Sequence, residues 1–382
     1  MKSSRMDNLH PYVPGEQPKD RTYIKLNANE NPYPPAPEVI KAVSDFVKTH
    51  PERLGLYPDP DSFVLRTAIA KMLNRTGGVL ADCRSTGTGC EPAEKDMLPF
   101  TITPEMIYCG NGSDEVLSFI FYAFFDSDRP LVLPEFTYSF YPVYAGFYAV
   151  PLDPVPLNSD WTLDTKTMTG RACAHDSGTI FANPNAPTGR MLSRDEVRQM
   201  IQKSPKDRVF VVDEAYADFG TESCIPLLAE FDNLVIVRTF SKSFCGAGLR
   251  LGYIVAAPDI VKTVTTVKNS LNHFPVDAVT QIAGKAACES VSYYVQCAKK
   301  IVEEREKFSA FLKQKDWSVI PSCTNFIFTR PRAVSGKKVY EHIKQNGILL
   351  RRFDTAGIEE YLRITIGTAG QMSVLCSALS NL

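Results

Sequence analysis

Residues 239–252 read TFSKSFCGAGLRLG and follow the apolar run 234–237 after Arg238. One lysine, Lys242, lies between two serines, and glycines follow at positions 246, 248 and 252. A dinucleotide-binding loop requires the order GxGxxG between a strand and a helix. Position 251 is leucine, however, and the sequence continues as LRLGYIVAA, which predicts a strand. The glycines therefore favour a loop that folds back, and Lys242 at the strand end is either a surface lysine or a nucleophile.

The segments around this stretch alternate apolar strands with helical patterns. Strands are predicted at 131–134, 148–152, 178–182, 208–213, 233–238 and 250–256. Helices are predicted at 113–125, 193–203 and 259–270, and Ser193 with Glu196 forms a capping box for the second helix. Such alternation predicts an α/β domain with a mostly parallel sheet, whose ligands bind at the carboxyl ends of the strands.

The rest of the chain suggests three parts. The proline-rich segment 1–40 is expected to be an extended arm, because proline interrupts helices and strands. Residues 41–275 form the predicted large domain, with a helix at 62–75 and a long loop at 77–105 that is rich in Gly, Ser, Thr and Pro. Residues 276–382 form a predicted smaller α+β domain, with a helix at 292–314 and strands at 324–329 and 361–366.

Composition restricts the class of protein. The 382 residues carry 42 Lys and Arg against 43 Asp and Glu, without a basic patch, so nucleic acid is not an expected partner. No apolar run approaches the roughly 20 residues of a membrane span. The ten cysteines form no CxxC pair and the five histidines are scattered, which predicts free thiols in a reducing cytoplasm and no metal site.

Four further features fall near predicted strand ends, and each has an ordinary alternative. The glycine turn before Ser113 is either a phosphate seat or a plain helix N-cap. Tyr138 offers a stacking surface or packs in the core. The stretch NPNAPTG at 183–189 presents amides to a ligand or only forms a turn. Asp213, with Tyr216 three residues later, ends an apolar strand, where it needs a polar partner or solvent.

Together these features fit a single ligand, pyridoxal 5'-phosphate. That cofactor requires a lysine for a Schiff base and an acid that keeps its pyridine nitrogen protonated. It also requires donors for its phenolate oxygen, a ring to stack on, and cationic and backbone donors for its phosphate. Arg250, eight residues after Lys242, supplies a guanidinium group of the kind that binds phosphate.

The motifs GNGSDE, NPNAPTG, DEAY and SKSFCGAGLRLG resemble those of the fold-type I, pyridoxal-phosphate-dependent aminotransferases. LHPYVPGEQP at 9–18, KLNANENP at 25–32 and YPDP at 57–60 are similar to the histidinol-phosphate aminotransferase family. The resemblance covers essentially the whole chain. It implies an α/β fold with a seven-stranded, mostly parallel sheet in the large domain.

The resemblance also implies roles around the cofactor ring. Lys242 is expected to form the Schiff base and to move the proton at the substrate's Cα, and Asp213 to pair with the pyridine nitrogen. Tyr216 is expected to bond the phenolate oxygen and Tyr138 to stack on the ring. The family commonly has asparagine where this chain has alanine at position 186, so the neighbouring Asn185 is the candidate substitute.

Further roles concern the phosphate group and the substrate. The resemblance implies that Ser113, Asp114, Ser241 and Arg250 hold the cofactor phosphate, and that Tyr57 reaches it from the other subunit of a homodimer. For the substrate it implies that Arg363 binds the carboxylate and that Arg351 and Tyr12 meet the phosphate-bearing end, with Asn29 as a further substrate-binding residue.

The implied reaction converts L-histidinol phosphate and 2-oxoglutarate to imidazole acetol phosphate and L-glutamate, a step of histidine biosynthesis. Two related enzymes remain as alternatives, an aromatic amino acid aminotransferase and a threonine-phosphate decarboxylase-like enzyme. A non-enzymatic alternative is a regulatory or binding protein that keeps the fold. The hypothesis of a nicotinamide-dependent oxidoreductase is supported only by the glycine pattern, which Leu251 interrupts.

Overall fold

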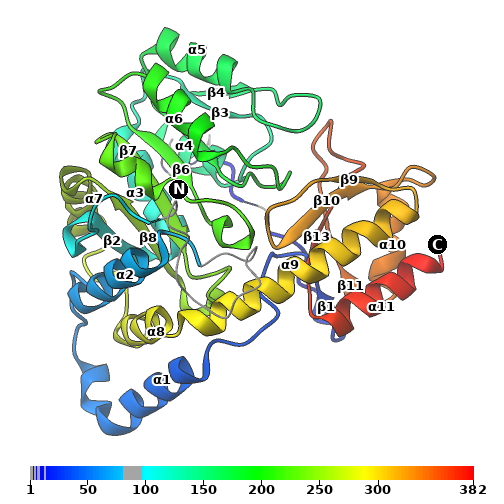
Figure 1. The fold of residues 1–382 in the computed structure, drawn as a ribbon, viewed down its shortest axis with the longest axis horizontal. Helices are drawn as coiled ribbons and strands as arrows, with labels where there is room; N and C mark the ends of the chain where they lie inside the picture. Colours follow the sequence, from blue (N-terminus) through cyan, green and yellow to red (C-terminus); the bar gives the residue numbers. More distant parts are fainter. Residues whose placement is uncertain (1–2, 4–5, 7–8, 13, 81–96) are drawn as a thin grey trace.

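A seven-stranded sheet lies at the centre of the larger part of the molecule (Figure 1). The computed structural model describes residues 3, 6, 9–12, 14–80 and 97–382. The strand order is β2-β8-β7-β6-β5-β3-β4, and among these strands β8 alone runs antiparallel to its neighbours. The strands are Ile107–Asn111 (β2), Leu131–Pro134 (β3), Leu152–Val155 (β4), Thr179–Ala182 (β5), Phe210–Asp213 (β6), Leu234–Thr239 (β7) and Leu251–Ala256 (β8). The mostly parallel, seven-stranded sheet expected from the sequence is confirmed.

Both faces of this sheet are covered, which explains why its strands read as continuous apolar runs. Leu234 and Ile236 of β7 pack into one core, whereas Val235 and Val237 pack into the other. Six α-helices contribute to the first core: Pro37–Thr49 (α1), Phe63–Thr76 (α2), Thr165–His175 (α5), Arg194–Lys203 (α6), Ala278–Glu289 (α8) and the start of Val291–Gln314 (α9). Three contribute to the second: Gly112–Phe124 (α3), Tyr141–Tyr148 (α4) and Pro258–Leu271 (α7).

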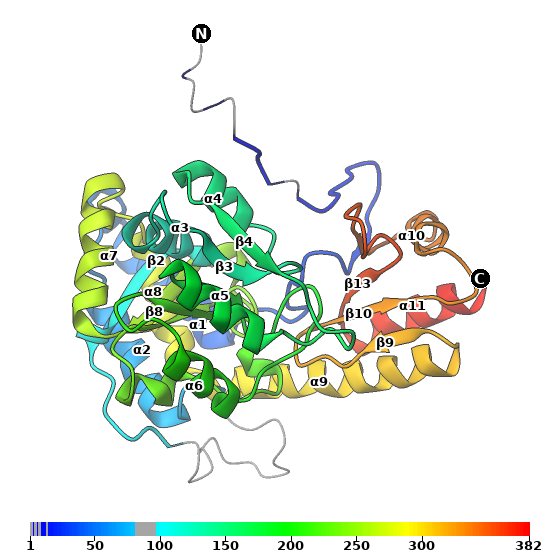
Figure 2. The same ribbon diagram turned by 90° about the horizontal axis from the view of Figure 1, so that it is seen from above.

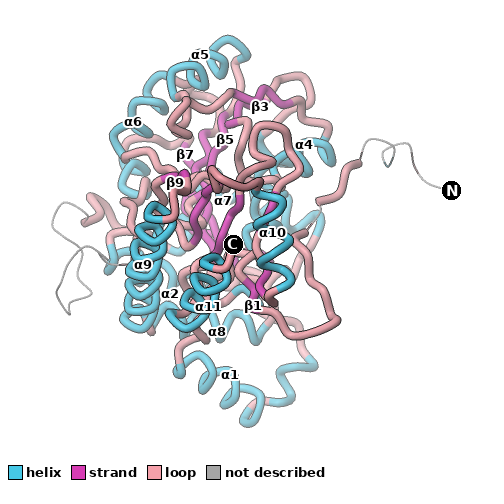
Figure 3. The backbone as a smooth tube through the Cα atoms, turned by 90° about the vertical axis from the view of Figure 1, so that its right-hand side faces the viewer, coloured by secondary structure: helices cyan, strands magenta, loops and turns pink. Residues whose placement is uncertain are grey.

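The C-terminal part contains a second sheet, with the antiparallel order β12-β13-β10-β9. Its strands are Ser318–Ile320 (β9), Phe326–Arg330 (β10), Arg351–Arg352 (β12) and Leu362–Thr365 (β13). Val291–Gln314 (α9), Gly336–Gln345 (α10) and Ala369–Ser380 (α11) pack against it, and Figure 3 shows α9, α11 and α10 in a row. The long helix α9 extends from the large sheet into this part (Figures 1 and 2).

The N-terminal segment crosses to the C-terminal part. Ile24–Lys25 (β1) pairs in parallel with Ile348–Leu349 (β11). Short 3-10 helices complete the regular structure: Pro51–Gly55 (η2), Pro104–Met106 (η4), Ala217–Phe219 (η5), Ile225–Ala229 (η6) and Ala247–Leu249 (η7). None of the helices in the described part of the chain combines the length and the apolar character that crossing a bilayer requires.

One strand prediction was wrong. Residues 148–152 were expected to form a strand, but α4 continues to residue 148 and β4 begins only at residue 152. The buried apolar positions 141, 144 and 145 follow helical spacing, and Pro142 lies in the first turn, where proline favours a helix. Ala149 ends the helix in a left-handed conformation with φ 57°. Most of the predicted loop at 77–105 falls on residues 81–96, outside the described residues.

Candidate active site

The functional residues expected from the sequence meet at the carboxyl ends of β6 and β7, beside the N-terminus of α3. A cavity of about 360 Å³, called the inner cavity here, lies at this edge of the sheet. Eight predicted residues line it: Ser113, Asp114, Tyr138, Asp213, Tyr216, Ser241, Lys242 and Arg250. Because β6 and β7 are parallel neighbours, they deliver Asp213 and Lys242 to the same place.

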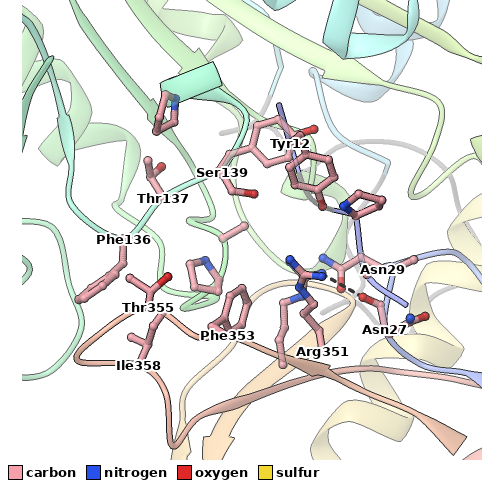
Figure 4. A pocket seen from close by; sticks show the side chains of 18 of the residues that line it. Tyr12, Asn27, Asn29, Phe136, Thr137, Ser139, Arg351, Phe353, Thr355 and Ile358 are labelled. Carbon is pink, nitrogen blue, oxygen red and sulfur yellow. Dashed lines mark hydrogen bonds between the residues drawn. The ribbon is translucent and has the colours of Figure 1, made fainter. Parts of the chain in front are cut away.

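A second cavity of about 540 Å³, the outer cavity, adjoins the inner one, and Tyr138, Tyr216 and Lys242 line both. The four predicted substrate-binding residues line the outer cavity: Tyr12, Asn29, Arg351 and Arg363. Figure 4 shows Arg351 beside Asn27 and Asn29 on one side. Phe136 and Ile358 lie on another side, so the cavity has a polar wall and an apolar wall (Figure 4).

Asp213 is a buried carboxylate at the end of β6, with 4% of its surface exposed. Its Oδ2 accepts a hydrogen bond from Tyr141 Oη at 2.9 Å, and its Oδ1 accepts one from the Ala215 amide at 3.0 Å. Burial raises the pKa of Asp213 to about 6, and these two hydrogen bonds oppose the shift. A cationic group in the inner cavity would favour the charged carboxylate.

The lysine lies next to an aromatic ring. Lys242 Nζ is 5.6 Å from the centroid of the Tyr216 ring. The backbone oxygen of Lys242 accepts a hydrogen bond from Asn31 Nδ2 at 2.9 Å, so the N-terminal segment supports the lysine loop. The antiparallel pairing of β7 with β8 confirms the predicted chain reversal after Lys242.

At the end of the inner cavity near α3, the backbone of β8 and the Arg250 side chain both lie very close to the first residues of α3. A Cβ atom on Gly252 would meet Ser113 N at 2.4 Å, and one on Gly112 would meet Arg250 Nη2 at 2.6 Å. The guanidinium group therefore lies directly over the start of α3. Among the described residues no side chain caps this helix, so its first amides are available to an anion.

Asp114, in the first turn of α3, is the shared partner of two other predicted residues. Its Oδ2 accepts from Arg250 Nη2 at 2.8 Å, and its Oδ1 accepts from Tyr138 Oη at 2.8 Å. Burial raises the pKa of Tyr138 well above its ordinary value, and the Asp114 charge acts in the same direction. Tyr138 therefore stays a neutral donor while its ring lines both cavities.

Tyr216 connects the two parts of the molecule. Its Oη accepts a hydrogen bond from Asn29 Nδ2 at 2.9 Å, and Asn29 Oδ1 accepts from Thr365 Oγ1 at 3.2 Å. Asn29 has φ 54°, a left-handed conformation that asparagine tolerates better than most residues. The chain thus fixes the Tyr216 hydroxyl by side chains from the N-terminal segment and β13.

Two arginines stand opposite each other on the neighbouring strands β12 and β13, where Arg351 and Arg363 are register partners. Arg363 Nη2 donates to the backbone oxygen of Asn27 at 3.1 Å, and its Nε is buried without a hydrogen-bond partner among the described residues. Burial lowers the pKa of Arg363, and the Arg351 charge also lowers it. Two adjacent cations in one cavity wall are suited to an anionic ligand.

Asn185 and Tyr57 line neither cavity. The Asn185 side chain is buried and donates to the backbone oxygen of Phe136 at 2.8 Å, whereas the adjacent Ala186 lines both cavities. Tyr57 is 83% exposed, and its ring stacks on Phe274 with a centroid distance of 4.5 Å. Neither side chain reaches the site within this chain.

A buried ion network beneath the lysine loop was not predicted from the sequence. Arg238 Nη2 donates to Asp218 Oδ1 at 2.7 Å, and Arg238 Nη1 donates to Glu214 Oε2 at 3.0 Å. Ser243, directly after Lys242, donates to Asp218 Oδ2 at 2.5 Å. An arginine inside the apolar strand LVIVRT was a readable signal, because a buried charge needs a partner. Tyr141, the partner of Asp213, gave no comparable signal.

The arrangement provides an amine beside a buried acid, an anion seat at a helix start, and a second anion site across the cavity. Within the described ranges, no group of three or more His, Cys, Asp or Glu residues is placed to hold a metal ion.

Comparison with known proteins agrees with this geometry. The family model described as aminotransferase class I and II matches residues 21–379. The chain belongs to the class I and II aminotransferase family. It is 42% identical over 383 residues to the histidinol-phosphate aminotransferase of Syntrophus aciditrophicus, an alignment that covers 100% of this chain and 98% of that relative. It is 39% identical over 372 residues to histidinol-phosphate aminotransferase 2 of Dechloromonas aromatica, covering 97% and 96%.

Solved structures share the fold of this aminotransferase. Histidinol-phosphate aminotransferase from Sinorhizobium meliloti, solved in complex with pyridoxal-5'-phosphate, has a TM-score of 0.79 at 22% identity and covers 94% of this chain and 91% of that chain. Aspartate aminotransferase from Thermus thermophilus with maleate has a TM-score of 0.78 at 16% identity, covering 100% and 99%. The expected fold-type I architecture is confirmed by these similarities.

Proposed function

We propose that this aminotransferase uses pyridoxal 5'-phosphate to convert L-histidinol phosphate and 2-oxoglutarate to imidazole acetol phosphate and L-glutamate. The observation that supports this substrate most directly is the pair Arg351 and Arg363 in the wall of the outer cavity, which Lys242 also lines. Two cations suit substrates that carry a phosphate or a second carboxylate. The curated relatives described above are named for the same reaction.

The residues of the inner cavity fit the cofactor. Arg250, Ser241 and the open first turn of α3 would hold its phosphate, as the close approach of Gly112 and Gly252 permits. Asp213 would keep the pyridine nitrogen protonated. The buried carboxylate has no cationic partner among the described residues, and a protonated pyridine would supply one. The bound cofactor supplies an electron sink that weakens the bonds at the substrate's Cα.

The side chains of this chain then have distinct tasks. Lys242 Nζ would hold the cofactor covalently and would take and return the proton at the substrate's Cα. Tyr216, whose hydroxyl accepts from Asn29, would donate to the cofactor's phenolate oxygen. Tyr138, whose hydroxyl donates to Asp114, would stack on the cofactor ring. Asn185 has no task in this scheme, because its amide is bonded to the backbone of Phe136.

Substrate recognition uses the polar wall of the outer cavity. Arg363 would bind the carboxylate of glutamate or 2-oxoglutarate, and its unpartnered buried Nε favours such a ligand. Arg351 and Tyr12 would bind the phosphate of L-histidinol phosphate. Both halves of the reaction thus use the same cavity with different cations.

A substrate panel tests the proposal. The half-reaction is followed by ultraviolet-visible absorbance with L-histidinol phosphate, phenylalanine and threonine phosphate in separate samples. L-Histidinol phosphate is expected to react fastest, and Arg351→Gln to raise its KM roughly 10-fold to 100-fold by removing a charged hydrogen bond. Arg352→Gln is the matched control, because Arg352 pairs with Asp354 and does not line the outer cavity.

Each alternative has its own outcome in that panel. Faster reaction of phenylalanine would make the chain an aromatic amino acid aminotransferase, and loss of carbon dioxide from threonine phosphate would make it a decarboxylase. Cofactor binding without turnover on any amine would favour a regulatory protein.

We also propose a homodimer in which Tyr57 binds the cofactor phosphate of the neighbouring subunit. Tyr57 belongs to an exposed apolar surface around η2 and the start of α2, formed by Leu54, Leu56, Tyr57, Phe63 and Val64, each more than half exposed. A surface of this kind is typical of a protein interface. Light scattering is expected to give twice the 42.5 kDa chain mass. Mixing Lys242→Ala and Tyr57→Ala chains is expected to regain turnover that neither variant has alone.

A reducing compartment, the cytoplasm, is the proposed location. The eight described cysteines are all free thiols: Cys109, Cys173, Cys224, Cys245, Cys288, Cys297, Cys323 and Cys376. Free thiols are typical of proteins kept in reducing conditions. Fractionation of the source cells with an antibody to this chain tests the location.

A further inference from the structure

Two cysteines from distant segments meet beside the lysine loop. Cys245 lies three residues after Lys242, and Cys297 lies in the first half of α9. Their thiol groups are hydrogen-bond partners, and both are free. Neither residue lines the inner or the outer cavity, so the pair is separate from the proposed catalytic groups.

The surroundings hold the two sulfur atoms together. The Phe244 ring packs on the Tyr294 ring of α9, with a centroid distance of 5.0 Å. Cys297 lies three residues after Tyr294, on the same face of the helix, so that face meets the segment containing Cys245. Tyr293 Oη donates to the backbone oxygen of Pro34 at 2.8 Å, which fixes the N-terminal segment against the same part of α9.

The pair has the properties of a reactive dithiol. The hydrogen bond from Cys245 lowers the pKa of Cys297 to about 7, with help from the Lys300 charge and against the effect of burial. A thiolate is the nucleophilic form of cysteine, so the lowered pKa favours the reactive form of Cys297, which is 3% exposed. Cys245 is partly exposed and has a left-handed backbone with φ 51°.

We propose that Cys245 and Cys297 form an oxidisable pair that peroxides convert to a disulfide, clamping the lysine loop to α9. The Cys297 thiolate attacks one oxygen of hydrogen peroxide, breaking the O–O bond and giving a sulfenic acid and, after proton uptake, water. The Cys245 sulfur then attacks the sulfenic sulfur, forming the S–S bond and releasing the second water. Two thiols lose two electrons, and one peroxide is reduced to two waters.

The bond would restrain the part of the chain that carries the proposed catalytic lysine. α9 extends from the large sheet to the C-terminal sheet, so the disulfide would join the Lys242 loop to the helix that links both parts (Figure 1). Disulfides in cytosolic proteins are usually transient and redox-sensing. We expect turnover to fall as the bond forms; this part of the inference rests on the proposed function.

Peptide mapping tests the pair directly. Reduced holoenzyme is treated with hydrogen peroxide, alkylated, digested without reductant and analysed by mass spectrometry. A linked peptide containing Cys245 and Cys297 is expected in the unsubstituted chain and in Cys173→Ser, whose exposed residue is the control. The link is expected to be absent from Cys245→Ser and Cys297→Ser. Alkylation of both thiols after a treatment that oxidises Cys173 would overturn the proposal.

Turnover of the same samples completes the test. Activity is expected to decrease in proportion to the linked fraction, to return with dithiothreitol, and to resist peroxide in Cys245→Ser. Full linkage without loss of turnover would refute the switch. An inactive reduced enzyme would instead refute the proposed function, and the mapping result would still decide whether the pair is oxidisable.

Discussion

Replacing Asp213 by asparagine is expected to stabilise the protein after its cofactor has been removed. The carboxylate is buried and has no cationic partner among the described residues, and its pKa is raised from 3.8 to about 6. The folded state binds this proton more tightly than the unfolded state does. The ionised carboxylate therefore lowers the free energy of unfolding, and this penalty is absent below pH 3.8. It grows as the pH rises through about 6 and is constant above that value.

The magnitude follows from the size of the shift. A difference of about two pKa units corresponds to about 3 kcal/mol at pH 8, and the remaining penalty at pH 4.5 is about 1 kcal/mol. Asparagine keeps an oxygen that accepts from the Ala215 amide. Its NH2 group replaces Oδ2, however, and so removes the acceptor of the Tyr141 hydrogen bond. That loss costs about 1 kcal/mol. The net gain is therefore about 2 kcal/mol at pH 8 and close to zero at pH 4.5.

Thermal unfolding at both pH values measures this difference. For a chain of this length, about 2 kcal/mol corresponds to a Tm increase of roughly 2–3 °C at pH 8. Asp218→Asn is the matched control and is expected to destabilise, because it leaves the buried Arg238 with less compensating charge. An Asp213→Asn protein less stable than the unsubstituted chain at pH 8, or equally stabilised at both pH values, would refute the reasoning.

Two further substitutions test how the backbone supports the site. Gly252→Ala is expected to weaken cofactor binding and lower Tm, because its Cβ would meet Ser113 N at 2.4 Å. Gly170→Ala, with nothing within 4 Å and outside both cavities, should lower neither; fluorescence titration and unfolding measure both. Lys268→Met is expected to weaken the dimer, because it removes the 2.8 Å bond that fixes Pro60 near Tyr57; unchanged sedimentation at low protein concentration would contradict this.

Much of the central fold was predictable from local sequence. Parallel strands buried on both faces read as apolar runs, and their carboxyl ends carry Asp213 and Lys242. Periodicity over short apolar runs is less decisive, which is why the sequence predicts a strand at residues 148–152 where the structure has the end of a helix. There the helix depends on Pro142 and on side chains that pack against α3 and the sheet.

The partners of the site residues were less predictable. Asn29 reaches Tyr216 across 187 positions of the chain, and Arg351 faces Arg363 only because β12 and β13 pair in one register. Such contacts depend on topology, and local patterns do not specify it. The same holds for the bond from Tyr141 to Asp213.

The most direct test of the central claim is to find where the cofactor is attached. Holoenzyme is reduced with borohydride, digested and analysed by mass spectrometry, with Lys268 as a buried lysine remote from both cavities for comparison. One reduced pyridoxyl phosphate per chain is expected, on the peptide that contains Lys242, and none on Lys242→Ala. Labelling of a different lysine, or no labelling of a protein that still transaminates, would contradict the claim.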